Sequence, residues 1–304
     1  MTQNATTIAE EFEARSKRPF LIRALAGTRR FAVRKPLGAI GFVVLILLIS
    51  SSVFAPVFST HDPNAQNIKE RLTGMSADHF FGTDQFGRDL YTRVVYGGRV
   101  SLRVAFQAVL IAKVVGLVLG LVSGYFGGRT DMVIQRIVDI KMAFPSLILT
   151  LAIVSIMQPS LNNVAWAIAI ASLPSTIRVI RAQTLSVKEM DYVEAARALG
   201  ASPVRIMAFH ILPQCWAPLI IILSASLGGA ILTETSLSFL GLGVPPPAPT
   251  WGGMLAGASQ QYMERAPWLV IWPGVAISLV VFGFNLFGDA LRDVLDPRLR
   301  GSQG

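Results

Sequence analysis

Residues 190–214, MDYVEAARALGASPVRIMAFHILPQ, form a moderately polar stretch between strongly apolar segments. Apolar residues in its first half recur at positions i, i+3, i+4 and i+7, a spacing that places them on one face of an α-helix. The residues on this face are Tyr192, Ala195, Ala196 and Leu199. A short helix with such a small-residue face is suited to dock into a groove on another protein.

The second half of the stretch predicts a sharp break followed by another helix. Gly200 follows the last residue of the face, where a C-terminal cap favours a residue that adopts a left-handed backbone. Ser202 and Pro203 then stand in the order of an N-cap and a first helical position. Pro213 is expected to mark the start of the next apolar segment.

The composition indicates a membrane protein. Of 304 residues, 52% are hydrophobic and 15% are charged, whereas a soluble domain has about 25% charged residues. The net charge of +9 does not indicate a nucleic-acid partner, because much of it precedes the first apolar segment, as at the cytoplasmic end of a span. A single cysteine, Cys215, excludes an internal disulfide.

Six apolar segments are close to the roughly 20 residues that cross a bilayer. They are residues 36–58, 100–124, 132–157, 163–183, 215–240 and 268–291. We therefore expect an all-α membrane protein with about six transmembrane helices. The expected divisions are a tail with an interfacial helix at 1–35, a first span at 36–58, an external loop at 59–98, a core of five spans at 99–292 that contains the helix pair at 189–213, and a tail at 293–304.

Charge also predicts the orientation of the chain. The loop at 59–98 is slightly acidic and the N-terminal segment is basic, so the N-terminus is expected in the cytoplasm and the loop outside. Six spans then place residues 184–214 and the C-terminus in the cytoplasm. Within the second span, Gly116, Gly120 and Gly124, followed by Gly127 and Gly128, predict close contact between helices in lipid.

Motifs for catalysis or cofactor binding are missing from the sequence. It has no GxxxxGK[ST] phosphate loop, GxSxG elbow, HExxH, CxxC or EF-hand pattern. Its three histidines, His61, His79 and His210, are far apart in sequence and on opposite sides in this topology. We therefore expect no catalytic residue, no cofactor and no metal site in this chain, and an energy source that lies in another chain.

Glu194-Ala195-Ala196, Gly200 and Leu212-Pro213 resemble the EAA motif of ABC importer permeases. In that family the motif forms coupling helices that seat in a groove on the ATPase subunit. His210 stands where the family pattern has an aliphatic residue, with Ile211 beside it. The resemblance implies an ATPase-coupling interface formed by Tyr192, Glu194, Ala195, Ala196, Arg197, Leu199, Gly200, Ser202 and Pro203. Alternatively, Glu194 is a solvated residue that pairs with Arg197 or Arg205.

Further segments resemble the dipeptide/oligopeptide/nickel permeases, in particular their second permease subunit. The segments include Phe81-Gly82-Thr83-Asp84, Gly87-Arg88-Asp89, Ser101-Leu102, residues 238–243 (SFLGLG), Trp251-Gly252 and residues 288–293 (GDALRD). The resemblance implies the ABC type I importer permease fold in a bacterial cytoplasmic (inner) membrane. It also implies three kinds of partner: a homologous permease subunit in a heterodimer, two ATP-binding subunits and an external solute-binding protein.

Two ionisable residues, Lys113 and Glu234, lie inside apolar spans. A charge at the bilayer centre costs about 2.5–3.5 kcal/mol on insertion scales, so each is expected to face protein or water. Pairing with one another, contact with the partner subunit and a place on the translocation path all remain open. For Lys113, snorkelling to the interface is a further alternative.

The function expected from these features is transport of peptides or similar small solutes, driven by separate ATPase subunits. Nickel chelates, glutathione-like thiols and opine-like compounds remain open as solutes. One alternative is an autonomous channel or secondary carrier, for which inverted repeats are expected and none is visible. An intramembrane enzyme is the last alternative, and the sequence offers no nucleophile–base pair for it.

Overall fold

Within residues 33, 35–259 and 261–295, which the computed structural model describes, the chain is nearly all helical. The expected all-α fold is therefore confirmed. The predicted interfacial helix up to residue 32 and the tail from residue 296 lie outside the described residues. The helices are α3 (Pro36–Val53), α4 (Ala55–Phe58), η1 (Ile68–Glu70), α5 (Leu90–Phe126), α6 (Gly128–Met142), α7 (Ser146–Met157), α8 (Leu161–Lys188), α9 (Asp191–Ala198), α10 (Pro203–Ile206), η2 (Met207–Ile211), α11 (Leu212–Phe239), α12 (Trp251–Ser259) and α13 (Trp268–Leu295).

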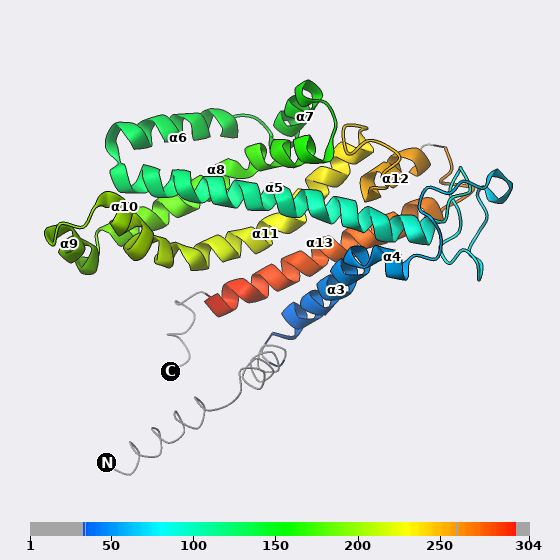
Figure 1. The fold of residues 1–304 in the computed structure, drawn as a ribbon, viewed down its shortest axis with the longest axis horizontal. Coiled ribbons are helices and arrows are strands. Elements are labelled where there is room, and N and C mark those ends of the chain that lie inside the picture. Colours follow the sequence, from blue (N-terminus) through cyan, green and yellow to red (C-terminus); the bar gives the residue numbers. More distant parts are fainter. Residues whose placement is uncertain (1–32, 34, 260, 296–304) are drawn as a thin grey trace, which may run out of the picture.

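Among the described residues, five helical segments are long and apolar enough to cross a membrane. They correspond to α3, α5, α8, the run from α10 through α11, and α13. Figure 1 shows α5, α8, α11 and α13 running lengthwise through the molecule. Their buried apolar side chains form the main core, to which α3 also contributes.

The third predicted span, residues 132–157, is not one straight helix. The structure has two helices there, α6 and α7, which meet at 94°. Pro145 explains the break, because a proline disfavours helical backbone at the residue before it. α6 accordingly ends at Met142, and α7 begins at Ser146. The pair counts as a sixth span only if both helices cross together.

The two carboxylates of α6 are paired with arginines of α8. Arg181 donates two hydrogen bonds of 2.6 Å to Asp131, and Arg178 pairs with Asp139 at 2.7 Å. Lys141 donates to a main-chain carbonyl of α8. α6 is thus tied to α8 along its length.

The contact between α5 and α8 is made by the predicted glycines. A Cβ on Gly116 would lie 2.6 Å from Cβ of Thr176, and one on Gly120 would lie 2.7 Å from Cβ of Ile180. A Cβ on Gly124 would lie 2.6 Å from the side chain of Thr184. Gly127 and Gly128 do not continue this seam: both have positive φ and form the turn into α6.

Two polar regions lie at opposite ends of the long helices (Figure 1): α9 and α10 at one end, and the loop between α4 and α5 at the other. The loop is shorter than the predicted 59–98, because the Asp89 side chain accepts a hydrogen bond from the Thr92 N–H at 2.8 Å and starts α5 at Leu90. Between the last two predicted spans, 215–240 and 268–291, the chain forms a further helix, α12, where none was predicted.

Candidate functional site

The break after α9 has the geometry of a Schellman motif. The Gly200 N–H donates to the Arg197 carbonyl at 3.0 Å, and the Ala201 N–H donates to the Ala196 carbonyl at 3.1 Å. Gly200 has φ +82°, the left-handed conformation that glycine adopts without a steric penalty. The predicted C-cap is confirmed.

The second helix begins as predicted and then runs on without a stop. The Ser202 hydroxyl accepts a hydrogen bond from the Arg205 N–H at 3.4 Å, and Pro203 is the first residue of α10. Pro213 lies at the start of α11, as expected, although α10, η2 and α11 together form one helical run from Pro203 to Phe239. The π-helical turn η2 precedes Pro213, and this wider turn accommodates a residue that has no N–H to donate.

The α9–α10 hairpin buries one side and exposes the other. Val193 is fully buried in a small cluster that joins α9 and α10 to the ends of α8 and α11, with Val187, Ile206, Ile211 and Cys215 among its members. The predicted face of α9 points outward: Leu199 is 89% exposed and Tyr192 is 41% exposed. On the following turns, Val204 and Phe209 are 70% and 74% exposed.

Polar side chains of the hairpin are available to a partner. Glu194, Arg197 and Arg205 are exposed. In the part of the chain that the structure describes, Glu194 is in no ion pair, so the alternative that it pairs with a nearby arginine is not realised. His210 is held by Tyr192, whose hydroxyl donates to the His210 carbonyl at 3.4 Å and whose ring stacks on the imidazole.

Lys113 and Glu234 are both buried and are not paired with each other. The Lys113 ammonium donates to the Thr176 hydroxyl at 3.0 Å. Glu234 accepts a hydrogen bond from the Ser238 hydroxyl at 2.7 Å, while its Oε2 atom has no partner among the described residues. Glu234 lies where α12 packs against α11, since a Cβ on Gly252 would meet the Thr235 carbonyl. Their place on the translocation path stays a prediction.

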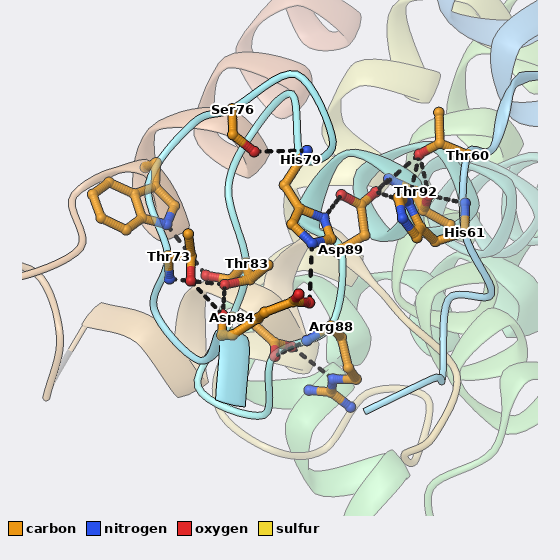
Figure 2. A network of polar contacts seen from close by, with 12 residues as sticks. Thr60, His61, Thr73, Ser76, His79, Thr83, Asp84, Arg88, Asp89 and Thr92 are labelled. Carbon is orange, nitrogen blue, oxygen red and sulfur yellow. Dashed lines mark hydrogen bonds and ion pairs between the residues drawn. The ribbon is translucent and has the colours of Figure 1, made fainter. Parts of the chain in front are cut away.

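At the opposite end, the Phe81–Asp89 segment folds into a polar turn over the start of α5 (Figure 2). Asp84 accepts hydrogen bonds from the Phe86 and Arg88 N–H groups and from the Arg88 guanidinium at 2.6 Å. Phe81 stacks on Trp272 of α13 with ring centroids 3.9 Å apart. Phe81 also meets the ring of Tyr91 of α5 edge-on, with centroids 5.1 Å apart, so the turn is fixed to both α5 and α13.

Beside this turn lie two histidines that are far apart in the sequence. The rings of His61 and His79 lie 4.9 Å apart, and His79 Nδ1 lies 2.9 Å from Asp89 Oδ1. Burial lowers the pKa of His79, but its hydrogen bonds to Asp89 and Glu70 outweigh this and raise the pKa above its ordinary value. The sequence signal for this pair is that both histidines belong to one predicted loop. His210 belongs to η2, which follows α10 at the other end of the molecule.

Comparison with protein families identifies the chain. Residues 116–301 match the family described as binding-protein-dependent transport system inner membrane component, and residues 28–74 match the N-terminal transmembrane domain of oligopeptide transport permease C. The chain belongs to this permease family. It is therefore an ABC transporter permease and a multi-pass protein of the inner membrane, as the sequence predicted.

Relatives of this permease extend over most of its length. The dipeptide transport system permease protein of Alkalihalophilus pseudofirmus is 46% identical over 88% of both chains. The probable D,D-dipeptide transport system permease protein of Escherichia coli is 42% identical over 88% of this chain and 90% of that one. The glutathione transport system permease protein of Pectobacterium atrosepticum is 41% identical over 90% of both.

A solved structure shows the same fold. A chain of the inward-facing MetNI methionine ABC transporter superposes with a TM-score of 0.56 at 19% identity. The match covers 68% of this permease and 98% of that chain. The predicted ABC importer permease fold is thus confirmed.

Proposed function

We propose that this permease is the second of two unlike transmembrane subunits in an ATP-driven importer of peptides or similar small solutes. Its termini lie in the cytoplasm, and its α9–α10 hairpin docks on one of two ATP-binding subunits. A homologous permease subunit completes the pore, and an external solute-binding protein delivers the solute. In this proposal the chain needs no cofactor for transport and catalyses no reaction, and ATP hydrolysis belongs to the partner subunits.

The observation that carries the proposal is the outward apolar face of the hairpin. Leu199 and Val204 are exposed beside Glu194, Arg197 and Arg205. Lipid tails do not cover an apolar surface surrounded by charged side chains, because those charges require water or polar partners. A protein groove with an apolar floor and a polar rim satisfies both groups.

The buried side of the hairpin provides a route for coupling. Val193 of α9 and Ile206 of α10 pack in one cluster with Val187 of α8 and Cys215 of α11. Movement of the groove that holds the hairpin is therefore passed to two long helices. Alternating access follows when this movement switches the pore between two arrangements.

The solute class rests on the relatives. Dipeptides, a D,D-dipeptide and glutathione are named for relatives that are 41–46% identical over most of this chain. Their shared chemistry is a short chain of amide-linked amino acids. We therefore expect short peptides as the solutes of this importer.

Single-cysteine cross-linking tests the docking site. Because Cys215 is the only cysteine and is buried, Cys215→Ala gives a cysteine-free chain with little change in volume. On this background, Leu199→Cys and Val204→Cys are expected to cross-link to an ATP-binding subunit. The control is Ile68→Cys, which is 71% exposed at the opposite end and is expected to give no such product.

Labelling of the same variants in intact cells tests the orientation. A membrane-impermeant maleimide is expected to label Ile68→Cys directly and Leu199→Cys only after permeabilisation. The reverse pattern contradicts the proposed topology. Peptide uptake into proteoliposomes without ATP-binding subunits would show instead an autonomous channel or carrier.

A further inference from the structure

We propose that His61, His79 and Asp89 form a binding site for a borderline divalent transition-metal ion, with Zn²⁺ as the representative. The three side chains come from separate parts of the chain. His61 follows α4, His79 lies in the turn before Phe81, and Asp89 caps the start of α5. Figure 2 shows them side by side in the polar network at this end of the molecule.

The separations of the donor atoms fit one small ion. The donor atoms of the three side chains all lie within 4.8 Å of one another. His79 Nδ1 is 2.9 Å from Asp89 Oδ1, and His61 Nδ1 is 3.9 Å from Asp89 Oδ2. Two ligands bound tetrahedrally to Zn²⁺ at about 2.0–2.1 Å are about 3.3 Å apart. The His79 distance is shorter than this, and the His61 distance, which runs to the other carboxylate oxygen, is longer. Small rotations of the half-exposed His61 side chain close the remaining difference.

Neighbouring groups already orient two of the three ligands. His79 Nε2 lies 3.4 Å from Glu70 Oε2, the contact by which a carboxylate holds the second ring nitrogen of a metal-binding histidine protonated. Metal binding releases the Nδ1 proton that is shared with Asp89, and the freed lone pair of Nδ1 then faces the ion beside the carboxylate. Asp89 uses Oδ2 to cap α5 through the Thr92 N–H, and a carboxylate has lone pairs to spare on Oδ1.

The donor set decides the class of ion. Two imidazoles and one carboxylate suit Zn²⁺ and, by the same ligand preference, Ni²⁺, Co²⁺ or Cu²⁺, whereas Mg²⁺ and Ca²⁺ prefer oxygen ligands alone. Three protein ligands leave a fourth position for water. Access is through His61, whose side chain is 40% exposed, while Asp89 is 1% exposed.

A bound ion ties the loop to the helices on either side of it. His61 stands just after α4, and Asp89 is the N-cap of α5, so the ion links the two ends of the loop directly. His79 adds the middle of the loop. Binding therefore stabilises the folded loop, independently of whether the chain transports a solute.

Metal titration of the complete purified chain in detergent tests the site, with an affinity tag that contains no histidine. Co²⁺ serves as a spectroscopic probe, and Zn²⁺ is measured by competition with a chromophoric chelator. His61→Ala and His79→Ala each remove one ligand. The matched control is His210→Ala, which removes the third of the chain's 3 histidines, at the other end of the molecule.

The unchanged chain and His210→Ala are expected to bind one equivalent of Co²⁺ with a visible absorption band, and Zn²⁺ is expected to displace it. His61→Ala and His79→Ala are expected to bind Zn²⁺ at least tenfold more weakly. Glu70→Gln is expected to weaken binding by about 10–100-fold, as loss of an orienting carboxylate does elsewhere.

His61→Ala is the decisive variant, because its side chain is exposed and its loss leaves the fold intact. Affinity in His61→Ala equal to that of the unchanged chain overturns the proposal. So does a chain that shows no saturable binding, or an equal loss of binding in His210→Ala.

Discussion

Replacing Gly200 with valine tests whether the break between α9 and α10 must hold one angle. Gly200 has φ +82°, and no atom lies within 4 Å of a Cβ built on it. The substitution therefore causes no collision, and its whole cost is backbone strain, about 1–3 kcal/mol for a residue held in a disfavoured conformation. That energy reduces the population of the native hairpin by roughly 5- to 150-fold relative to the relaxed one.

The assay is ATP-dependent uptake by the complete transporter in proteoliposomes, together with co-purification of the ATP-binding subunits. We expect Gly200→Val to lower uptake while the chain still inserts into membranes. Gly200→Asn is expected to retain most activity, because asparagine tolerates the left-handed conformation.

A matched control separates strain from docking. Gly241 has φ +79° and equally empty surroundings, but lies after α11 at the opposite end of the molecule. Gly241→Val therefore carries similar strain, and we expect it to leave ATPase association unchanged. Normal uptake and normal association in Gly200→Val would refute the reasoning, since the angle of the hairpin would then not matter.

Three further predictions concern the spans. Gly120→Val places a Cβ 2.7 Å from Cβ of Ile180, so we expect overpacking to cost about 1–3 kcal/mol and to lower the thermal midpoint of unfolding. The control is Gly229→Ala, whose Cβ meets no atom within 4 Å and which should not lower the midpoint. Asp131→Asn breaks the two hydrogen bonds with Arg181, at a cost of about 1 kcal/mol, and should speed hydrogen exchange in α6. The control is Asp139→Asn, which should have less effect because Asp139 is more exposed. Equal exchange rates in the two variants would contradict this prediction. Glu234→Gln replaces a fully buried carboxyl, so the thermal midpoint of unfolding should stay the same or rise. Reduced uptake by this variant would support a place for Glu234 on the translocation path, and unchanged uptake would remove Glu234 from that path.

Local patterns in the sequence were enough to predict the hairpin. The order Gly200, Ser202, Pro203 specifies a cap, an N-cap and a helix start, and each requires only neighbouring residues. The glycine seam was predictable for the same reason, because spacing of four on one helix fixes a face. The fold determines which helix packs against that glycine face, so the glycine spacing alone did not identify α8 as the partner.

Average hydropathy hides both the bend between α6 and α7 and the charge pairs of α6, and only the bend has a local signal in the sequence. The α6–α7 segment is apolar enough to read as one span, but its charges face Arg178 and Arg181 on α8, which lie more than 30 residues away in the chain. Pro145 was a visible signal for the bend and received too little weight.

The histidine pair depends on how the loop folds back on itself. Gly82 and Gly87 have positive φ and turn the chain so that His79 reaches Asp89. Arg93 ties the loop down by donating to the Pro63 carbonyl at 2.7 Å. No periodic pattern in the sequence specifies these turns, so the separation of 18 residues between His61 and His79 gave no indication of contact.

The seam between α5 and α8 restricts how this permease can move. Gly116, Gly120 and Gly124 each hold a side chain of α8 closer than a Cβ permits, and their neighbours along α5 are larger. A slide or rotation of α5 by one residue therefore places larger side chains, such as Leu117 and Leu121, where these glycines have only a hydrogen atom. The two helices must travel as a single rigid body, and the motion of a transport cycle has to be absorbed elsewhere, at the bend between α6 and α7 or at the prolines within α11 and α13.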